Sequence, residues 1–210
     1  MKGKFISLEG VEGVGKSTNL AHIKTRLEAN GLTVIETREP GGTDMAEEIR
    51  AMLLRPRSES VSEMAELLLM FAARAQHIHA LIQPALEAGH WVLCDRFTDA
   101  TFAYQGGGRG VSMQWIATLE SMVQQTLRPN LTFLLDLPVE IGLERARKRS
   151  DFDRFEAEKV QFFQSVRNVY LQRAAEEPNR FAIIDASPSL EKVQQQIDRA
   201  IEQRLGLVAA

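Results

Sequence analysis

The chain has 210 residues, of which 44% are hydrophobic and 25% are charged, and this composition excludes disordered, collagen-like and fibrous proteins. Its length predicts one compact domain over residues 1–210. The 25 Lys and Arg residues nearly balance the 28 Asp and Glu residues, giving a formal charge of −3. This balance argues against binding of nucleic acid through phosphate neutralisation, but it does not exclude a small basic pocket.

Cysteine content and hydropathy indicate a cytoplasmic location without membrane contact. The single cysteine, Cys94, excludes an intrachain disulfide and a cysteine-based zinc cluster. Apolar runs such as residues 67–73 are far shorter than the ~20 residues that span a bilayer. The apolar stretch at residues 5–8 is ended by Glu9, too early for the core of a signal peptide.

Strand and helix patterns alternate along the chain. Apolar residues recur at helical spacing between the strands, as in Leu20, Ile23 and Leu27. Five runs rich in β-branched and aromatic residues predict buried strands at residues 4–8, 33–37, 91–95, 131–137 and 181–185. This alternation predicts an α/β fold, a five-stranded parallel sheet with helices on both faces, which binds ligands at the carboxyl ends of its strands.

Three segments interrupt the alternation and are expected to be loops that bind ligands. Residues 39–43 and 105–110 are rich in glycine, and residues 145–158 are rich in charge. A long helix is expected between the first two, from about residue 61 to residue 88. The histidines lack a metal-ligand pattern, and we expect His77, His79 and His90 on a helix surface or in turns.

A glycine-rich motif follows the first predicted strand and precedes a helix expected at about residues 16–29. Residues 10–17 match G-x-x-x-x-G-K-[S/T], in which backbone N–H groups and the helix dipole surround a phosphate. Lys16 would reach the β and γ phosphates, and the Ser17 hydroxyl would bind Mg²⁺. The motif predicts a nucleoside triphosphate and Mg²⁺ at Gly10, Val11, Glu12, Gly13, Val14, Gly15, Lys16, Ser17 and Thr18.

The class of nucleotide enzyme can be narrowed from the rest of the sequence. A GTPase would carry Asn-Lys-x-Asp and Asp-x-x-Gly motifs, and the chain contains neither. A motor would need further domains, so the length favours a small phosphoryl-transfer enzyme.

The third predicted strand ends in Asp95 and Arg96. The carboxylate could hold Mg²⁺, and the guanidinium could bind a phosphate through two hydrogen bonds. An ordinary ion pair at the strand end is the simpler alternative. The fourth strand also ends in an aspartate, Asp136, but Arg96 and the glycine-rich segment beyond it favour Asp95.

Four segments together resemble the bacterial thymidylate kinases, in order and over nearly the whole chain. They are residues 10–18, Arg-Glu-Pro-Gly-Gly-Thr at 38–43, Asp-Arg-Phe at 95–97 with Ala-Tyr-Gln-Gly at 103–106, and the arginine-rich residues 145–156. The second and third are more specific than the phosphate loop. The resemblance implies a P-loop fold with a mobile lid at about residues 145–158. It also implies a homodimer that transfers the γ-phosphoryl group of ATP to dTMP in dTTP biosynthesis.

The resemblance also implies roles for individual residues. Arg38 and Arg96 would clamp the dTMP phosphate, Phe71 would stack on thymine, and Arg74 would bind the exocyclic oxygen of the base. Surface solvation is the alternative for Arg38, and without the resemblance Phe71 would more often be part of the core. Asp95 would position the acceptor or Mg²⁺.

Further implied contacts surround the sugar and the base. Thr101 and Gln105 would contact thymine, Thr101 replacing the Ser or Asn common in the family. Tyr104 would pack under the deoxyribose and disfavour a 2′-hydroxyl. Glu12, where the family often has Asp, would accept from the 3′-hydroxyl or arrange Mg²⁺ through water, unless it simply points to solvent.

In family members of the eukaryotic type, an arginine of the phosphate loop stabilises the transferred phosphoryl group. Residues 11–14 of this chain contain no arginine, so the resemblance implies that arginines of the lid supply this charge. The residues with implied catalytic roles are Lys16, Glu12, Arg96, Arg149 and Arg154. Arg145 and Arg147 are equally well explained as a solvated helix end, and residues 185–187 resemble the adenine-binding loop.

Two other functions are weighed against this one. A nucleotide-dependent ATPase or switch would lack a second nucleotide site, for which the Arg38 and Arg96 pair and the Phe71 and Arg74 pair argue. A deoxynucleoside kinase would not need two arginines for an unphosphorylated acceptor.

Overall fold

A parallel five-stranded sheet forms the centre of the computed structural model, which describes residues 3–56, 58–147 and 158–207. The strand order is β2-β3-β1-β4-β5, and every neighbouring pair is parallel. The strands are β1 (Phe5–Glu9), β2 (Val34–Arg38), β3 (Trp91–Asp95), β4 (Leu131–Asp136) and β5 (Phe181–Asp185). The predicted sheet is confirmed, and each predicted strand lies within one residue of its observed bounds.

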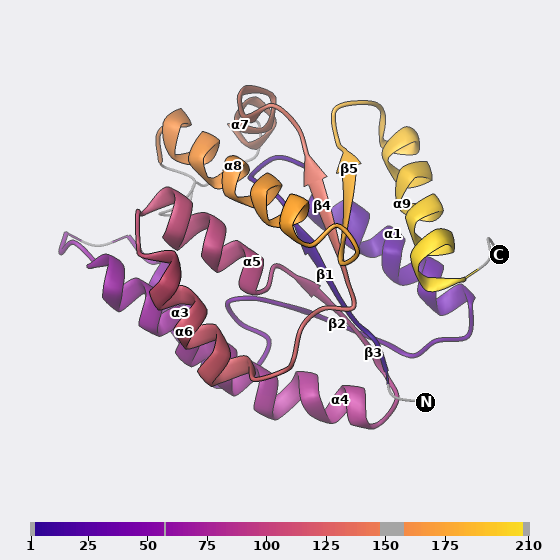
Figure 1. The fold of residues 1–210 in the computed structure, drawn as a ribbon, viewed down its shortest axis with the longest axis horizontal. Helices are drawn as coiled ribbons and strands as arrows, with labels where there is room; N and C mark the ends of the chain where they lie inside the picture. The colour runs from indigo at the N-terminus through magenta and orange to yellow at the C-terminus, as the bar shows by residue number, and fades with distance from the viewer. Residues whose placement is uncertain (1–2, 57, 148–157, 208–210) are drawn as a thin grey trace.

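The central strands read as continuous apolar runs because helices cover both faces of the sheet. All five residues of β1 and the first five of β4 are buried. In Figure 1, α1 and α9 lie on one side of the strands, and α3, α4, α5, α6 and α8 lie on the other. The helices are α1 (Lys16–Ala29), α2 (Asp44–Leu54), α3 (Glu63–His77), η1 (Ile78–Ile82), α4 (Gln83–Glu87), α5 (Thr98–Thr101), η2 (Phe102–Gly108), α6 (Met113–Gln124), α7 (Val139–Arg147), α8 (Val160–Glu176) and α9 (Leu190–Leu205).

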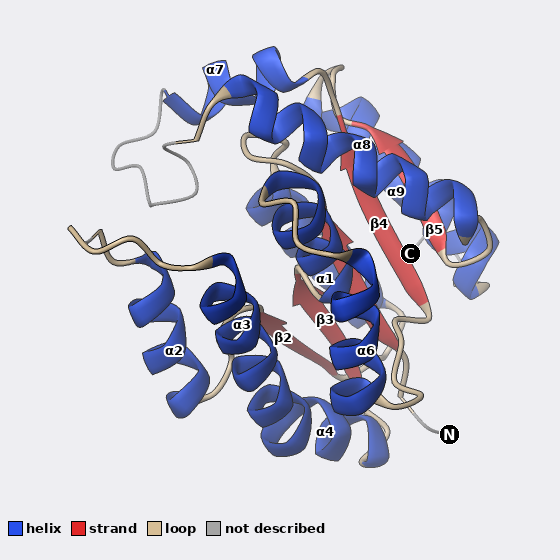
Figure 2. Ribbon diagram, turned by 60° about the vertical axis from the view of Figure 1, so that its left-hand side comes forward, coloured by secondary structure: helices blue, strands red, loops and turns tan. Residues whose placement is uncertain are grey.

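The long helix expected after residue 61 is present, with one irregularity. It begins at Glu63, where the Ser62 hydroxyl accepts a hydrogen bond from the Ala65 N–H at 3.2 Å and caps the first turn. The π-helical segment η1 then joins α3 to α4. Figure 2 shows α2 packed against α3, on the side of α3 away from the strands.

The segment expected to be a loop at residues 105–110 is mostly helical, so that prediction was wrong. Residues up to Gly108 form the π-helical segment η2, which packs against α8. A Cβ atom on Gly107 would lie 2.7 Å from the Val169 side chain, and one on Gly108 would lie 2.4 Å from Phe162. The glycines therefore permit close packing of two helices rather than a flexible loop.

No helix among residues 3–56, 58–147 and 158–207 has the length and apolar character that crossing a membrane requires.

Candidate active site

The phosphate loop connects β1 to α1. A left-handed glycine, Gly15 (φ 88°), precedes the first residue of α1, which leaves the N-terminus of the helix open toward a bound anion. Gly13 (φ 75°) passes so close to α7 that an added Cβ atom would collide with the Gly142 carbonyl. The loop therefore has the conformation that the glycine motif predicts.

Lys16 is held inside this loop. Its Nζ donates to the carbonyl oxygens of Gly10 at 3.2 Å and Val11 at 3.1 Å. Burial lowers the pKa of Lys16, and the positive charge of Arg96 lowers it further. A bound triphosphate would offer this ammonium group charged oxygens in place of the two carbonyls.

Arg96 joins the phosphate loop to the next pocket. It has a left-handed backbone (φ 65°), and its Nη2 donates to Glu12 Oε1 at 2.6 Å. The Tyr104 hydroxyl donates to the same oxygen at 3.0 Å, and the guanidinium lies 4.8 Å from the centre of the Tyr104 ring. Burial raises the pKa of Tyr104, so this phenol remains a donor. Glu12 thus faces Arg96 and Tyr104 rather than solvent.

A pocket lies beside this cluster, between the phosphate loop, α2, α3 and the start of η2. Six of the predicted site residues meet here: Glu12, Arg74, Arg96, Thr101, Tyr104 and Gln105. The pocket is also lined by Glu39, Pro40, Arg50, Leu54, Met70, Phe97 and Ala100. The pocket therefore combines the Arg96, Glu12 and Tyr104 cluster beside the phosphate loop with the buried Arg74 and its apolar neighbours.

Arg74 is fixed at its end of the pocket by a buried ion pair. Its Nε donates to Glu39 Oε2 at 2.7 Å, and its Nη2 donates to Thr101 Oγ1 at 2.9 Å. His77 Nδ1 lies 3.0 Å from the other Glu39 oxygen, and its Nε2 lies 2.7 Å from Thr37 Oγ1. Only 3% of the Arg74 side chain is exposed, so the guanidinium is presented in one orientation.

The expectation for His77 was wrong, and Glu39 was not predicted as a partner of Arg74. His77 is fully buried, because Gly42 and Thr37 lie directly against its ring. The sequence gives Glu39 no role of its own beyond its place in the Arg-Glu-Pro-Gly-Gly-Thr segment at residues 38–43. No local pattern in the sequence pairs the two residues, because Glu39 and Arg74 are 35 residues apart.

Phe71 does not lie where the resemblance implied. It packs with Leu67, Phe102 and Ile116 in a hydrophobic cluster, and its ring lies 4.8 Å from the Arg74 guanidinium. Met70 lines the pocket instead. Residues four apart lie on one helix face, so Met70 and Arg74 share the pocket side of α3 whereas Phe71 supports Arg74 from the core.

Arg38 lies in a neighbouring cleft, and the structure does not bring it into the pocket of Arg96. Its guanidinium makes two hydrogen bonds to Glu47, with Nη2 2.9 Å from Oε2 and Nε 3.2 Å from Oε1. This cleft also contains Ser17 and Asp95. Arg38 and Asp95 are paired in the register of β2 and β3, so the cleft adjoins the end of the phosphate loop.

Asp95 fits a role in holding Mg²⁺. Its Oδ1 is buried and has no hydrogen-bond partner within the described part of the chain. It shares a cleft with Ser17, the hydroxyl that the phosphate-loop motif assigns to the metal. Asp136, by contrast, is paired through both oxygens with Arg167 at 2.7 and 2.9 Å. The described residues contain no cluster of three His, Cys, Asp or Glu side chains that could hold a metal alone, so Mg²⁺ would depend on phosphate oxygens and water.

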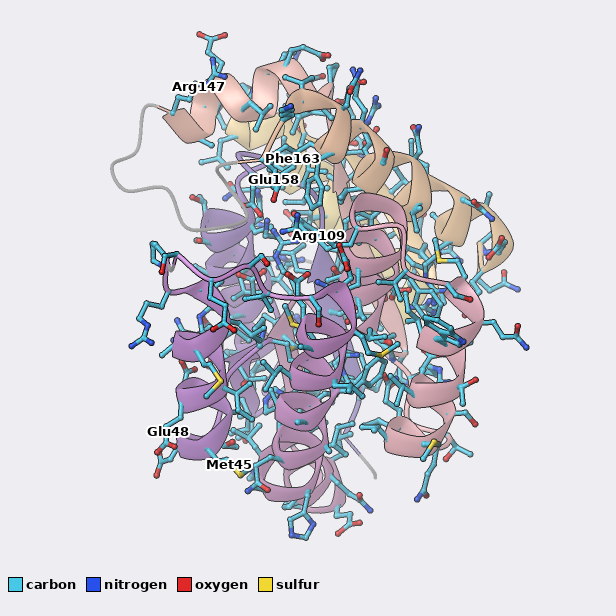
Figure 3. All side chains as sticks on the ribbon, turned by 90° about the vertical axis from the view of Figure 1, so that its left-hand side faces the viewer. Met45, Glu48, Arg109, Arg147, Glu158 and Phe163 are labelled. Atoms are coloured by element: carbon cyan, nitrogen blue, oxygen red, sulfur yellow. The ribbon has the colours of Figure 1, made fainter. Side chains whose placement is uncertain are left out.

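Of residues 145–158, which the resemblance implies to be a lid, only 145–147 and 158 are described; Arg149 and Arg154 lie outside the described residues. At one end, Arg145 donates to the backbone carbonyls of Ala186 at 3.0 Å and Ser187 at 3.3 Å, joining α7 to the loop after β5. At the other end, Glu158 pairs with Arg109, and Figure 3 shows the two residues next to each other. Arg109 also contacts Glu66 on α3 at 3.4 Å.

The parallel sheet and the glycine-rich loop between β1 and α1 are those of a P-loop nucleotide-binding protein, and the pocket beside the loop is the candidate acceptor pocket of a phosphotransferase. The family model described as thymidylate kinase matches residues 8–197. The chain belongs to the thymidylate kinase family, and the resemblance seen in the sequence is confirmed.

Individual relatives agree over nearly the full length. The chain is 57% identical to the thymidylate kinase of Teredinibacter turnerae over 202 residues, which cover 96% of this chain and 98% of the relative. It is 60% identical to that of Chromohalobacter salexigens over 205 residues, 97% of each chain. The crystal structure of thymidylate kinase from Ehrlichia chaffeensis superposes with a TM-score of 0.79 at 28% identity, covering 96% of this chain and 100% of that one.

Proposed function

We propose that the protein transfers the γ-phosphoryl group of ATP to the phosphate of dTMP, giving dTDP and ADP. The observation that carries this proposal is the contact between Arg96 and Glu12, 2.6 Å apart, where the acceptor pocket meets the phosphate loop. An acceptor phosphate bound at Arg96 would have an oxygen directed at the γ-phosphorus. That oxygen forms the new P–O bond as the bond to the β-phosphate oxygen breaks and ADP leaves.

The donor side of the reaction uses the phosphate loop. Backbone N–H groups of residues 10–18 would surround the β-phosphate, and Lys16 would exchange its two loop carbonyls for phosphate oxygens. Ser17 and Asp95 would hold Mg²⁺ directly or through water, and the metal ion would neutralise charge on the phosphates.

The acceptor phosphate would replace the carboxylates that pair with the two arginines, Glu12 at Arg96 and Glu47 at Arg38. Arg96 would bind it through two parallel hydrogen bonds, releasing part of its contact with Glu12. Glu12 and Tyr104 would then face the sugar, where the phenol ring leaves little room for a 2′-hydroxyl. Arg38 would have to leave Glu47, which is a low cost because more than a third of each side chain is exposed.

Base recognition would rest on Arg74. A guanidinium can donate to the exocyclic carbonyl of thymine but cannot accept from the amino group of cytosine. Thr101 shares a hydrogen bond with Arg74 and lines the same pocket as Gln105, and Met70 supplies an apolar wall against the flat base. Arg149 and Arg154 would complete the charge stabilisation of the transferred group.

The protein is also proposed to be a cytoplasmic homodimer. The helices α3 and α6 pack side by side and expose several large apolar side chains, an arrangement typical of protein interfaces. These are Met64, Leu68, Met113, Trp115 and Met122. The one cysteine is a free, buried thiol, which suits a reducing compartment.

The test is ADP formation from Mg-ATP with dTMP, dUMP, dCMP, dGMP, thymidine or no acceptor. We expect ADP and dTDP in equal amounts, with dTMP as the preferred acceptor. ADP formation that is independent of acceptor would indicate an ATPase or switch, and a preference for thymidine would indicate a nucleoside kinase.

A further inference from the structure

Two buried polar side chains lie close to Arg96 but do not line the acceptor pocket. Glu9 is the last residue of β1, and Tyr170 lies in the middle of α8. Their exposed fractions are 0% and 1%, and neither lines the acceptor pocket. Nothing in the roles described above uses either residue.

Both side chains are connected to Arg96. The Arg96 Nη1 atom donates to the Tyr170 hydroxyl oxygen at 3.3 Å and to the Gly10 carbonyl at 2.9 Å. The Tyr170 hydroxyl donates in turn to Glu9 Oε2 at 2.8 Å. The other Glu9 oxygen, Oε1, accepts from the backbone N–H of Phe97 at 2.7 Å. Glu9 therefore reaches Arg96 twice, through its side chain and through the peptide that follows it.

The backbone of Arg96 explains why such support is needed. Its φ of 65° is a left-handed conformation that residues other than glycine rarely adopt, and it turns the chain sharply at the end of β3. The Arg96 N–H is bonded to the Leu8 carbonyl at 3.0 Å, and Glu9 holds the next N–H. The end of β1 thus fixes both peptide groups around the turn.

We propose that Tyr170 and Glu9 are positioning residues for the phosphate clamp, which hold the Arg96 guanidinium toward the acceptor phosphate. This inference rests on the proposed function, in which Arg96 binds that phosphate. The hydroxyl of Tyr170 has one hydrogen, which is given to Glu9, so its oxygen lone pairs face the guanidinium. Burial raises the pKa of Tyr170, so the phenol keeps this hydrogen.

A purely structural role predicts a different result from a positioning role. If the role of Tyr170 is purely structural, loss of its hydroxyl lowers the stability of the fold and weakens the binding of all ligands equally. A positioning role affects only ligands that carry the phosphate. The conservative variant Tyr170→Phe keeps the ring and its edge-on contact with Tyr104, so the core stays filled.

The experiment compares binding of dTMP and thymidine by calorimetry in the wild type, Tyr170→Phe and Arg96→Lys. The KM values for ATP and dTMP and the kcat are measured for the same three proteins. We expect Tyr170→Phe to weaken dTMP binding about tenfold, because a hydrogen bond to a charged group is lost, and to leave thymidine binding and the KM for ATP within twofold.

Ser7→Ala is the matched control. Like Tyr170→Phe, it removes a buried hydroxyl, in this case one on β1 that is hydrogen-bonded to the Thr132 hydroxyl at 2.8 Å, and it should not change dTMP affinity. The inference is overturned if Tyr170→Phe binds dTMP as the wild type does, or weakens dTMP and thymidine equally. If Arg96→Lys itself leaves dTMP binding unchanged, the phosphate clamp of the proposed function is wrong, and the inference is overturned with it.

Discussion

Replacing Glu9 by glutamine should make the stability of the protein less dependent on pH. Burial raises the pKa of Glu9 to about 8, and the nearby negative charge of Asp99 adds to this effect. Arg96 and the hydrogen bonds from Tyr170 and Phe97 oppose it. The unfolded chain releases this proton near pH 4.5, its ordinary pKa, whereas the folded chain retains it to about pH 8.

The sign and size of the effect follow from this difference. Between pH 4.5 and about 8 the folded state binds more protons than the unfolded state, so the stabilisation present below pH 4.5 is lost as the pH rises. At about 1.36 kcal/mol for each pKa unit, the loss from Glu9 is at most about 5 kcal/mol. Glutamine has no charge to bury, so the free energy of unfolding of the variant should not fall by this amount as the pH rises.

The assay is urea unfolding of wild type and Glu9→Gln at intervals from pH 4.5 to pH 9. The free energy of unfolding of the variant, minus that of the wild type, should increase steadily up to about pH 8 and then level off. Glu48→Gln, at an exposed position of α2 labelled in Figure 3, controls for the loss of one charge. A constant difference between Glu9→Gln and wild type across this range would refute the reasoning.

Three further predictions concern the metal, the base and the interface. Asp95→Asn should raise the Mg²⁺ concentration needed for half-maximal activity at least tenfold while leaving thymidine binding unchanged; an unaltered Mg²⁺ titration would remove Asp95 from the metal site. Arg74→Lys keeps a charge beside Glu39 but loses the planar pair of donors, so the ratio of kcat/KM for dTMP over dCMP should fall at least tenfold, and a preserved ratio would mean that another group reads the base. Trp115→Glu should convert dimers to monomers in light scattering, whereas Met45→Glu, an exposed methionine on α2, should not; monomers in the wild type would contradict the proposed dimer.

The parts of the site that could be predicted from sequence are those encoded by neighbouring residues. The phosphate loop, its strand and its helix occupy one short segment, and glycine conformations decide its shape. The strands could be located because buried parallel strands are continuous apolar runs. Asp95 was preferred over Asp136 from its neighbours alone, and the pairing of Asp136 with Arg167 supports that preference.

The parts that could not be predicted depend on contacts between distant segments or on rotation about a helix axis. The choice between Met70 and Phe71 is a rotation of about 100° on α3, which sequence spacing near one arginine does not determine. The resemblance placed Arg38 beside Arg96, but its partner Glu47 comes from the following helix. Gly107 and Gly108 suggested a loop in the sequence because the residues of α8 that they pack against lie more than 50 residues further along the chain.

Label transfer tests the phosphotransferase function most directly. The protein would be incubated with ATP labelled at the γ-phosphate, Mg²⁺ and dTMP, and the labelled products would be separated. We predict that the label appears in dTDP in an amount equal to the ADP formed, with almost none in free phosphate. Label recovered mainly as free phosphate, at a rate that dTMP does not change, would contradict transfer and indicate hydrolysis.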